Sequence, residues 1–241
     1  MNDQRLITID GPAGCGKSTT VRRLAERLGA IAFSSGTIYR ALTHRVLQEV
    51  SAEDLAAMPD AQRRDLMLRV LRAHSIEVRE VVEGDRREFK VHVDGEHPGP
   101  VLHSSAVTRE VHWVADDGAV REALLPLQRE IRATVPIITE GRDMGSVVFP
   151  DAPVKIFLTA SVDERARRRH RELREKRGEE IAFEEVRADV EARDRFDRSR
   201  EVGPLIEPDG AVVVDSSGLT IEAVVERILA VVPVQWSEAC A

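Results

Sequence analysis

The segment from residue 11 to residue 18 constrains this chain most. It reads Gly-Pro-Ala-Gly-Cys-Gly-Lys-Ser and fits the pattern G-x-x-x-x-G-K-[ST] throughout. An apolar run at 6–9 precedes it as a buried strand would, and apolar residues recur at helical spacing over 19–29. In such a unit, backbone N–H groups surround phosphate oxygens at the positive end of the helix, so the segment predicts a loop that binds a nucleoside triphosphate. We expect nucleotide contacts from Gly11, Pro12, Ala13, Gly14, Cys15, Gly16, Lys17, Ser18 and Thr19.

Two side chains of this loop are expected to act on the phosphates. The Lys17 ammonium would bring a positive charge to the β and γ phosphates, and the Ser18 hydroxyl is suited to bind Mg²⁺. We therefore expect Mg²⁺ as the cofactor, bound as Mg·ATP, with Ser18 as its ligand from the protein. The alternative is a glycine turn with an incidental lysine, which the flanking strand and helix disfavour.

The remaining apolar runs predict the fold class. A short strand at 31–33 follows the first helix, and the segments 135–139, 154–158 and 211–214 are apolar enough to be buried strands of the same sheet. With the strand at 6–9 these make five. A strand–helix–strand order implies parallel strands, so we expect an α/β protein: a P-loop three-layer sandwich around a central five-stranded parallel sheet.

Other segments interrupt this pattern. Residues 37–71 are helical in pattern with a break near 58–59, whereas 74–93 alternates polar and apolar residues as an antiparallel hairpin does. Helical patterns return at 106–132 and 220–232. We divide the chain into core at 1–36, an insert with the small β element at 37–105, core at 106–160, a helical lid at 161–202, core at 203–232 and a loose tail at 233–241.

Composition excludes several classes of protein. The two cysteines, Cys15 and Cys240, make neither a disulfide framework nor a metal cluster, which suits a reducing cytoplasm. The short polar start at 1–5 is unlike a signal peptide, and no apolar run approaches the roughly 20 residues of a membrane helix. A net charge of −7 disfavours general nucleic-acid binding. We expect a cytoplasmic monomer with no nucleic-acid or membrane partner.

Residues 34–40 and 139–145 are candidates for binding a second substrate. Each follows a predicted strand, and α/β sheets bind ligands at the carboxyl ends of their strands. In the first segment, Tyr39 could pack near a base or ribose and Arg40 could hold a phosphate, although an ordinary helix start would look the same. The second segment sets Glu, Arg and Asp between glycines, which suits a turn that meets phosphate and hydroxyl groups but also a surface turn.

Arginines are dense over 164–177 and 193–200. Interleaved glutamates in the first stretch favour a solvated helix for most of them. If the chain transfers a phosphoryl group, however, some arginines must reach inward, because guanidinium groups stabilise the charge on that group. A helical hairpin closing over the nucleotide as a lid would supply them and exclude water.

These motifs together resemble the bacterial cytidylate kinases, members of the nucleoside-monophosphate kinase family. The resemblance runs from residue 7 to about residue 229 and rests on Ile-Asp-Gly-Pro-Ala-Gly at 9–14, Gly-Arg-Asp-Met-Gly at 141–145 and the segment 147–158. It implies transfer of the γ-phosphoryl group of ATP to CMP or dCMP, giving ADP and CDP or dCDP. It also implies that the insert is the monophosphate-binding domain.

The resemblance further implies the acceptor site. Arginines would hold the monophosphate, Ser35 and Asp143 would meet the base edge, and Asp197 would lie near the sugar hydroxyls. The catalytic residues are then expected to be Lys17, Arg142, Arg193 and Arg200. The expected CMP-binding residues are Ser35, Tyr39, Arg40, Arg121, Arg142, Asp143, Arg193, Asp197 and Arg200.

The chain departs from the family pattern at four places, and other functions remain open. Ser34 replaces an aspartate, Leu102-His103 an Ile-Arg pair, His112 a base-contacting serine and Ser146 a threonine. A kinase acting on UMP or on a non-nucleotide metabolite would share the loop and lid. A nucleotide-binding switch is a further alternative, but the chain has no Asn-Lys-x-Asp motif.

Overall fold

The computed structural model describes residues 5–83, 86–131, 135–177, 180–233 and 236. The chain forms two compact units. The first contains Met1–Phe33 and Thr134–Ala241, and the second is Ser34–Ala133. We describe each unit by itself, and the finer division into insert and lid stays a prediction.

The first unit is built on a five-stranded parallel sheet in the order β2-β5-β1-β6-β7. The strands are β1 (Leu6–Asp10), β2 (Ile31–Ser34, whose last residue begins the second unit), β5 (Ile137–Gly141), β6 (Val154–Thr159) and β7 (Val212–Asp215). Asp10, the last residue of β1, is in register with Gly141 of β5 and with Phe157 of β6. The α/β class and the five-stranded parallel sheet predicted from the sequence are therefore confirmed, and the carboxyl ends of the central strands lie together.

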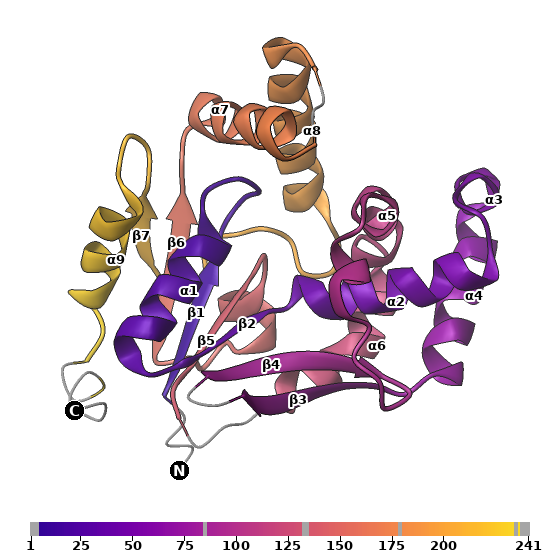
Figure 1. Cartoon of the computed structure of the whole chain (residues 1–241), viewed down its shortest axis with the longest axis horizontal. Helices are drawn as coiled ribbons and strands as arrows, with labels where there is room; N and C mark the ends of the chain where they lie inside the picture. Colours follow the sequence, from indigo (N-terminus) through magenta and orange to yellow (C-terminus); the bar gives the residue numbers. More distant parts are fainter. Residues whose placement is uncertain (1–4, 84–85, 132–134, 178–179, 234–235, 237–241) are drawn as a thin grey trace. The chain divides into compact units, whose positions relative to one another are not determined.

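Helices of the first unit cover the sheet and extend beyond its carboxyl end (Figure 1). They are α1 (Lys17–Leu28), α7 (Val162–Glu172), the short turn η3 (Leu173–Arg177), α8 (Phe183–Ser199) and α9 (Ile221–Leu229). Helices α1 and α9 pack on each other, and their apolar faces share one buried cluster with the central strands. Helices α7 and α8 pack side by side. The predicted helical hairpin is thus present, and Ser161 caps the start of α7 by accepting the N–H of Glu164.

Two expectations about burial are wrong. Strand β7 lies at the sheet edge, and Val212 and Val213 are 40% and 48% exposed. An edge strand has one neighbour, so apolar composition alone does not bury it. The predicted loose tail at 233–241 is wrong at Trp236, which is buried in the core cluster. Residues 234–235 and 237–241 lie outside the described residues.

The second unit combines helices with an antiparallel hairpin. Its elements are α2 (Gly36–Glu49), α3 (Ala52–Ala57), α4 (Asp60–Ala73), β3 (Ile76–Glu83), β4 (Arg86–Val93), the 3₁₀ turn η1 (Gly99–His103), α5 (Ser105–Ala115) and α6 (Gly118–Arg129). The predicted hairpin is confirmed, with Ile76 paired to Val93. The helical stretch expected at 106–132 is two helices, because Asp117 caps α6 by accepting the N–H of Val120. Residue 132 is not described. Among the described residues, none of the helices is long and apolar enough to cross a membrane.

Candidate active site

The loop between β1 and α1 has the backbone that phosphate binding requires. A Cβ atom on Gly11 would lie 1.9 Å from the carbonyl oxygen of Leu158, so only glycine fits against β6 there. Helix α1 begins at Lys17, and no side chain caps its N-terminus. Its first N–H groups, together with the positive end of the helix dipole, therefore suit an anion.

Lys17 is buried beneath this loop. Its Nζ donates to the carbonyl oxygens of Gly11 and Pro12 at 2.8 and 2.7 Å and lies 3.8 Å from Cys15 Sγ. Burial lowers the pKa of Lys17, and the nearby positive charge of Arg142 lowers it further. An ammonium group bound to carbonyl oxygens beside a second cation would gain from a phosphate anion.

Ser18 and Glu140 form an oxygen-rich pair next to the loop. The Ser18 Oγ donates to Glu140 Oε1 at 3.0 Å, and Glu140 is buried near the end of β5. A hydroxyl and a carboxylate are ligands that Mg²⁺ prefers, so the residues present fit this ion. The sequence places Glu140 after a strand, but gave it no individual role. The usable signal was a carboxylate at the carboxyl end of the strand adjacent to the loop.

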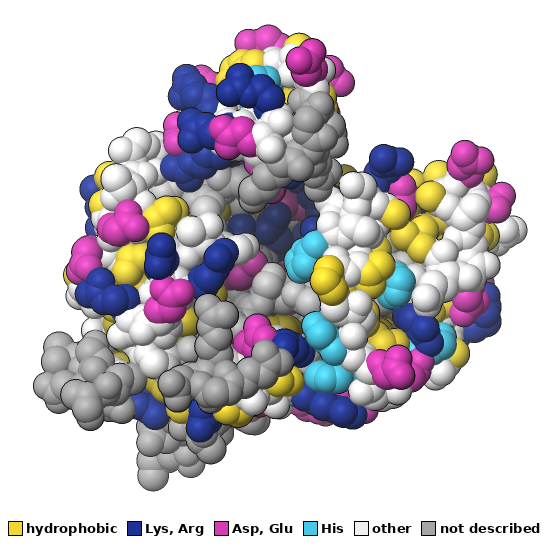
Figure 2. Space-filling model, in the orientation of Figure 1, with side chains coloured by type: hydrophobic (Ala, Val, Ile, Leu, Met, Phe, Trp, Pro, Cys, Tyr) yellow, Lys and Arg dark blue, Asp and Glu magenta, His cyan; other side chains and the backbone are white. Residues whose placement is uncertain are grey.

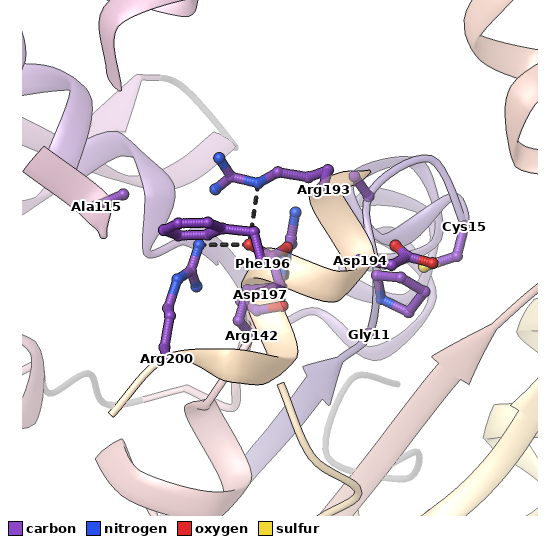
Figure 3. Close-up of polar contacts among 12 residues, drawn as sticks. Gly11, Cys15, Ala115, Arg142, Arg193, Asp194, Phe196, Asp197 and Arg200 are labelled. Carbon is purple, nitrogen blue, oxygen red and sulfur yellow. Dashed lines mark hydrogen bonds and ion pairs between the residues drawn. The ribbon is translucent and has the colours of Figure 1, made fainter. Parts of the chain in front are cut away.

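Three arginines surround Asp197 (Figure 3). The Nε of Arg142 donates to Asp197 Oδ2 at 2.7 Å, and the Nε of Arg193 lies 3.0 Å from Oδ1. The Nη2 of Arg200 donates to the same Oδ1. Burial raises the pKa of Asp197, but the three guanidinium groups outweigh it, so this pKa lies below its usual value. Arg193 and Asp197 lie one turn apart on α8, and Arg200 directly follows the last residue of that helix, so both arginines reach the one carboxylate.

Asp10 holds the turn that carries Arg142 and Asp143. Its Oδ1 accepts the N–H of Met144 at 2.8 Å and its Oδ2 accepts that of Gly145 at 2.7 Å. Burial raises the pKa of Asp10 to about 6, against the lowering effect of these two bonds. The last two residues of the 141–145 turn are thereby held at the end of β1.

The second unit contains the other predicted acceptor residues. Arg40 on α2 donates through Nη1 to the carbonyl oxygen of Leu102 at 3.0 Å and to Thr108 Oγ1 at 2.9 Å. The Arg121 guanidinium lies 5.3 Å from the centre of the Tyr39 ring, and Ser35 is buried just before α2. The predicted residues therefore form two groups, one within each unit.

Comparisons with known proteins identify the family. The family profile described as cytidylate kinase matches residues 7–234. The chain belongs to the cytidylate kinase family. It is 40% identical over 223 residues to a cytidylate kinase of Caldanaerobacter subterraneus subsp. tengcongensis, which covers 92% of this chain and 92% of the relative.

Solved structures also show some likeness to this member of the cytidylate kinase family. The shikimate kinase from Acinetobacter baumannii in complex with shikimate has a TM-score of 0.40 at 15% identity, over 94% of this chain and 92% of that chain. The gluconokinase from Sinorhizobium meliloti 1021 also has a TM-score of 0.40, at 16% identity, over 97% and 94%. TM-scores of this size support no inference about function.

Two departures from the family pattern change the chemistry of the second unit. His103 stands where the resemblance implies an arginine, and both burial and the neighbouring Arg40 lower its pKa. This position therefore carries less positive charge near neutral pH than an arginine would. His112 stands where the resemblance implies a serine. Its ring packs against Trp113 at a tilt of 41° with ring centres 4.3 Å apart, and its Nδ1 lies 2.8 Å from the Arg109 carbonyl oxygen.

The arginines of α7 are not alike. Lys and Arg side chains mix with Asp and Glu over the exposed surface of α7 and α8, at the top of Figure 2. Arg167 fits the expected solvated face, since its side chain is 60% exposed. Arg165 does not, because it is only 3% exposed. The sequence predicted a solvated helix for most of these arginines and an inward position for some, but did not identify Arg165 and the partly buried Arg168 as the inward ones.

Proposed function

We propose that the carboxyl edge of the sheet in the first unit is the place where this chain transfers the γ-phosphoryl group of ATP to CMP or dCMP. The observation that carries the proposal is the position of Arg142. Its guanidinium binds Asp197, and its charge also acts on Lys17 of the phosphate loop. One cation therefore acts both on the residues predicted to bind the triphosphate and on those predicted to bind the acceptor.

The loop residues 11–19 hold ATP in this proposal. Lys17 leaves its carbonyl partners for the β and γ phosphates, and N–H groups at the start of α1 bind phosphate oxygens. Ser18 and Glu140 hold Mg²⁺, with Glu140 added to the ligand expected from the sequence. Bound Mg²⁺ neutralises charge on the phosphate oxygens.

The arginines around Asp197 bind the acceptor phosphate in this proposal. Arg142, Arg193 and Arg200 hold it in line with ATP, and Arg40 and Arg121 keep the CMP-binding role that the resemblance implies. Ser35, Tyr39 and Asp143 contact the nucleoside, while Asp197 approaches the sugar hydroxyls. Positioning and electrostatics supply the catalysis, and the acceptor oxygen is already ionised near neutral pH, so no general base is required.

In this proposal the α7–α8 hairpin acts as a lid over the nucleotide, as expected from the sequence for residues 161–202. A lid that excludes water predicts that ADP release from ATP alone is much slower than in the presence of CMP. Equal rates with and without acceptor would contradict the lid. We further propose a monomer that works in the cytoplasm without nucleic-acid or membrane partners.

A coupled assay of ADP release tests the function. CMP, dCMP, UMP, AMP and GMP are offered as acceptors, and we expect CMP and dCMP to be preferred. Lys17→Ala should abolish turnover while leaving the far-UV circular dichroism unchanged. Turnover of UMP alone, or of a non-nucleotide acceptor only, would assign the chain to another P-loop kinase activity. Near-normal transfer by Lys17→Ala would refute the role of the loop.

A further inference from the structure

Donors from outside the phosphate loop bind two of its backbone carbonyl groups. The Arg165 Nη1 donates to the carbonyl oxygen of Ala13 at 3.2 Å. The Arg168 Nη1 donates to that of Cys15 at 3.2 Å, and the Ser216 Oγ donates to the same oxygen at 3.0 Å. Both arginines come from α7, whereas Ser216 follows β7. Two distant segments therefore hold one loop.

Arg165 is fixed by other bonds. Its Nε donates to the carbonyl oxygen of Ala160 at 3.0 Å, and its guanidinium pairs through both Nη atoms with Asp194 of α8. A Cβ atom on Gly14 would lie 3.3 Å from Arg165 Cβ, so α7 packs directly against the loop. This bidentate pair also connects the loop to the helix that carries Arg193 and Asp197.

Arg168 is fixed in a similar way. Its Nε donates to Glu164 Oε1 at 2.9 Å. Its Nη1 also donates to the Ser216 Oγ at 3.1 Å, and its Nη2 donates to the Ser216 carbonyl oxygen at 2.9 Å. The guanidinium therefore has little freedom to turn away from the loop.

Peptide geometry gives these contacts a consequence for ligand binding. In a planar trans peptide, the C=O of one residue and the N–H of the next point in opposite directions. Holding the C=O groups of Ala13 and Cys15 toward α7 therefore directs the N–H groups of Gly14 and Gly16 to the opposite side of the loop. A run of N–H groups aimed at one side is the arrangement that binds phosphate.

We infer that Arg165 and Arg168 are positioning residues that orient the Gly14 and Gly16 N–H groups for phosphate before the nucleotide binds. The inference rests on the proposed function, since it requires the loop to bind ATP. It assigns these arginines to the back of the loop, rather than to the transferred phosphoryl group. Pre-oriented donors spare the nucleotide the cost of ordering the loop.

Arg168→Ala tests the inference, and Arg167→Ala is its matched control. Arg167 is the next residue on the same helix, is mostly exposed and pairs with the same Glu164 at 3.7 Å. Calorimetry measures the Kd of Mg·ATP and of CMP for each variant. We expect Arg168→Ala to raise the Kd of Mg·ATP about tenfold, as loss of one charge-assisted hydrogen bond does, and to leave that of CMP unchanged. Arg167→Ala should alter neither, and Arg168→Lys should recover part of the loss.

A second readout uses the protein without nucleotide. In ¹⁵N-labelled Arg168→Ala protein, the Gly16 amide should shift and exchange its proton faster than in the wild type or Arg167→Ala. An unchanged Gly16 amide together with weakened ATP binding would mean direct contact with the nucleotide, and would overturn the inference. Equal losses of ATP and CMP binding would also overturn it, because they indicate general damage.

Arg165 needs a milder change, because Arg165→Ala would leave the partly buried Asp194 without this partner. Arg165→Lys keeps the charge, but a single ammonium group cannot reproduce the guanidinium hydrogen bonds to Asp194 and to the Ala13 carbonyl oxygen. We expect weaker Mg·ATP binding and a changed Gly14 amide, and an unchanged Gly14 amide would refute the role of Arg165. If the wild type bound Mg·ATP but phosphorylated neither CMP nor dCMP, the proposed function would fail while these amide results still stood.

Discussion

Replacing Asp10 by asparagine tests the electrostatics of the site through stability. The Asp10 carboxylate is completely buried at the end of β1 and accepts the N–H groups of Met144 and Gly145. Burial, its largest influence, raises its pKa from 3.8 to about 6, and the charge of Asp143 adds to this. Asparagine has nearly the same shape but cannot ionise, so Asp10→Asn removes the titration while retaining the packing.

The sign of the effect follows from the raised pKa. The folded protein binds this proton more tightly than the unfolded chain does, so the contribution to stability is complete below about pH 4 and is lost as the pH rises through about 6. A shift of about two pKa units is worth about 3 kcal/mol by pH 7. Roughly 1.4 kcal/mol of this falls between pH 5 and pH 7.5.

The asparagine amide carries a separate cost. Its NH₂ group must face one of the two backbone N–H donors, which costs about 1–3 kcal/mol at every pH. The free energy of unfolding of Asp10→Asn, relative to the wild type, should therefore rise with pH by the linkage amount, whatever its value at pH 5. The slope with pH separates the titration from the lost hydrogen bond.

Urea unfolding at several pH values between 5 and 7.5 measures this slope. Asp209→Asn is the matched control, because Asp209 is an exposed aspartate of the same unit. Its difference from the wild type should stay flat across the range. A flat difference for Asp10→Asn as well would refute the assignment of a buried carboxylate that ionises near pH 6.

Three further predictions concern the charged groups of the site. Glu140→Gln should raise the Mg²⁺ concentration needed for half-maximal turnover, and an unchanged Mg²⁺ titration would exclude Glu140 from the metal site. Asp197→Asn should lower the free energy of unfolding by about 3 kcal/mol at pH 7 because it removes a buried counterion. Since the pKa of Asp197 in the folded protein is lowered, this loss of stability should shrink as the pH falls through that pKa. Urea unfolding at acid pH measures it, and a loss that did not change with pH would contradict the ion pairs. Mg·ATP binding should raise the lowered pKa of Lys17. Calorimetry in buffers of different ionisation enthalpy should therefore detect proton uptake at alkaline pH, and uptake that persists in Lys17→Ala would assign it to another group.

Local patterns made the loop and the sheet predictable. The G-x-x-x-x-G-K-[ST] pattern binds phosphate through its own backbone, so residues 11–18 were enough to predict a phosphate-binding loop. Buried strands were recognisable as apolar runs in the same way. The burial of Val212 and Val213 was predicted wrongly, because burial depends on strand order and an apolar run does not reveal that β7 lies at the edge of the sheet.

The roles of single charged residues were less predictable. Arg165, Arg167 and Arg168 look equivalent in a run of arginines and glutamates, and only the rotation of α7 relative to the loop distinguishes the buried one from the exposed one. Glu140 was more accessible to inference, because the end of β5 next to β1 faces the same edge as the loop. Trp236 gave no local signal of docking into a core formed by distant segments.

The repulsion between Lys17 and Arg142 supports the proposal that the phosphate loop and the arginines around Asp197 take part in one reaction. Arg142 lowers the pKa of Lys17, while Asp197 holds Arg142 in place and raises its pKa. The protein thus keeps a buried and a partly buried positive charge close enough to oppose each other, a cost that folding alone does not require. An anion between them would be attracted by both and would relieve their repulsion. The phosphoryl group passing from one nucleotide to the other is such an anion, and it is attracted most when it lies between the donor and acceptor sites.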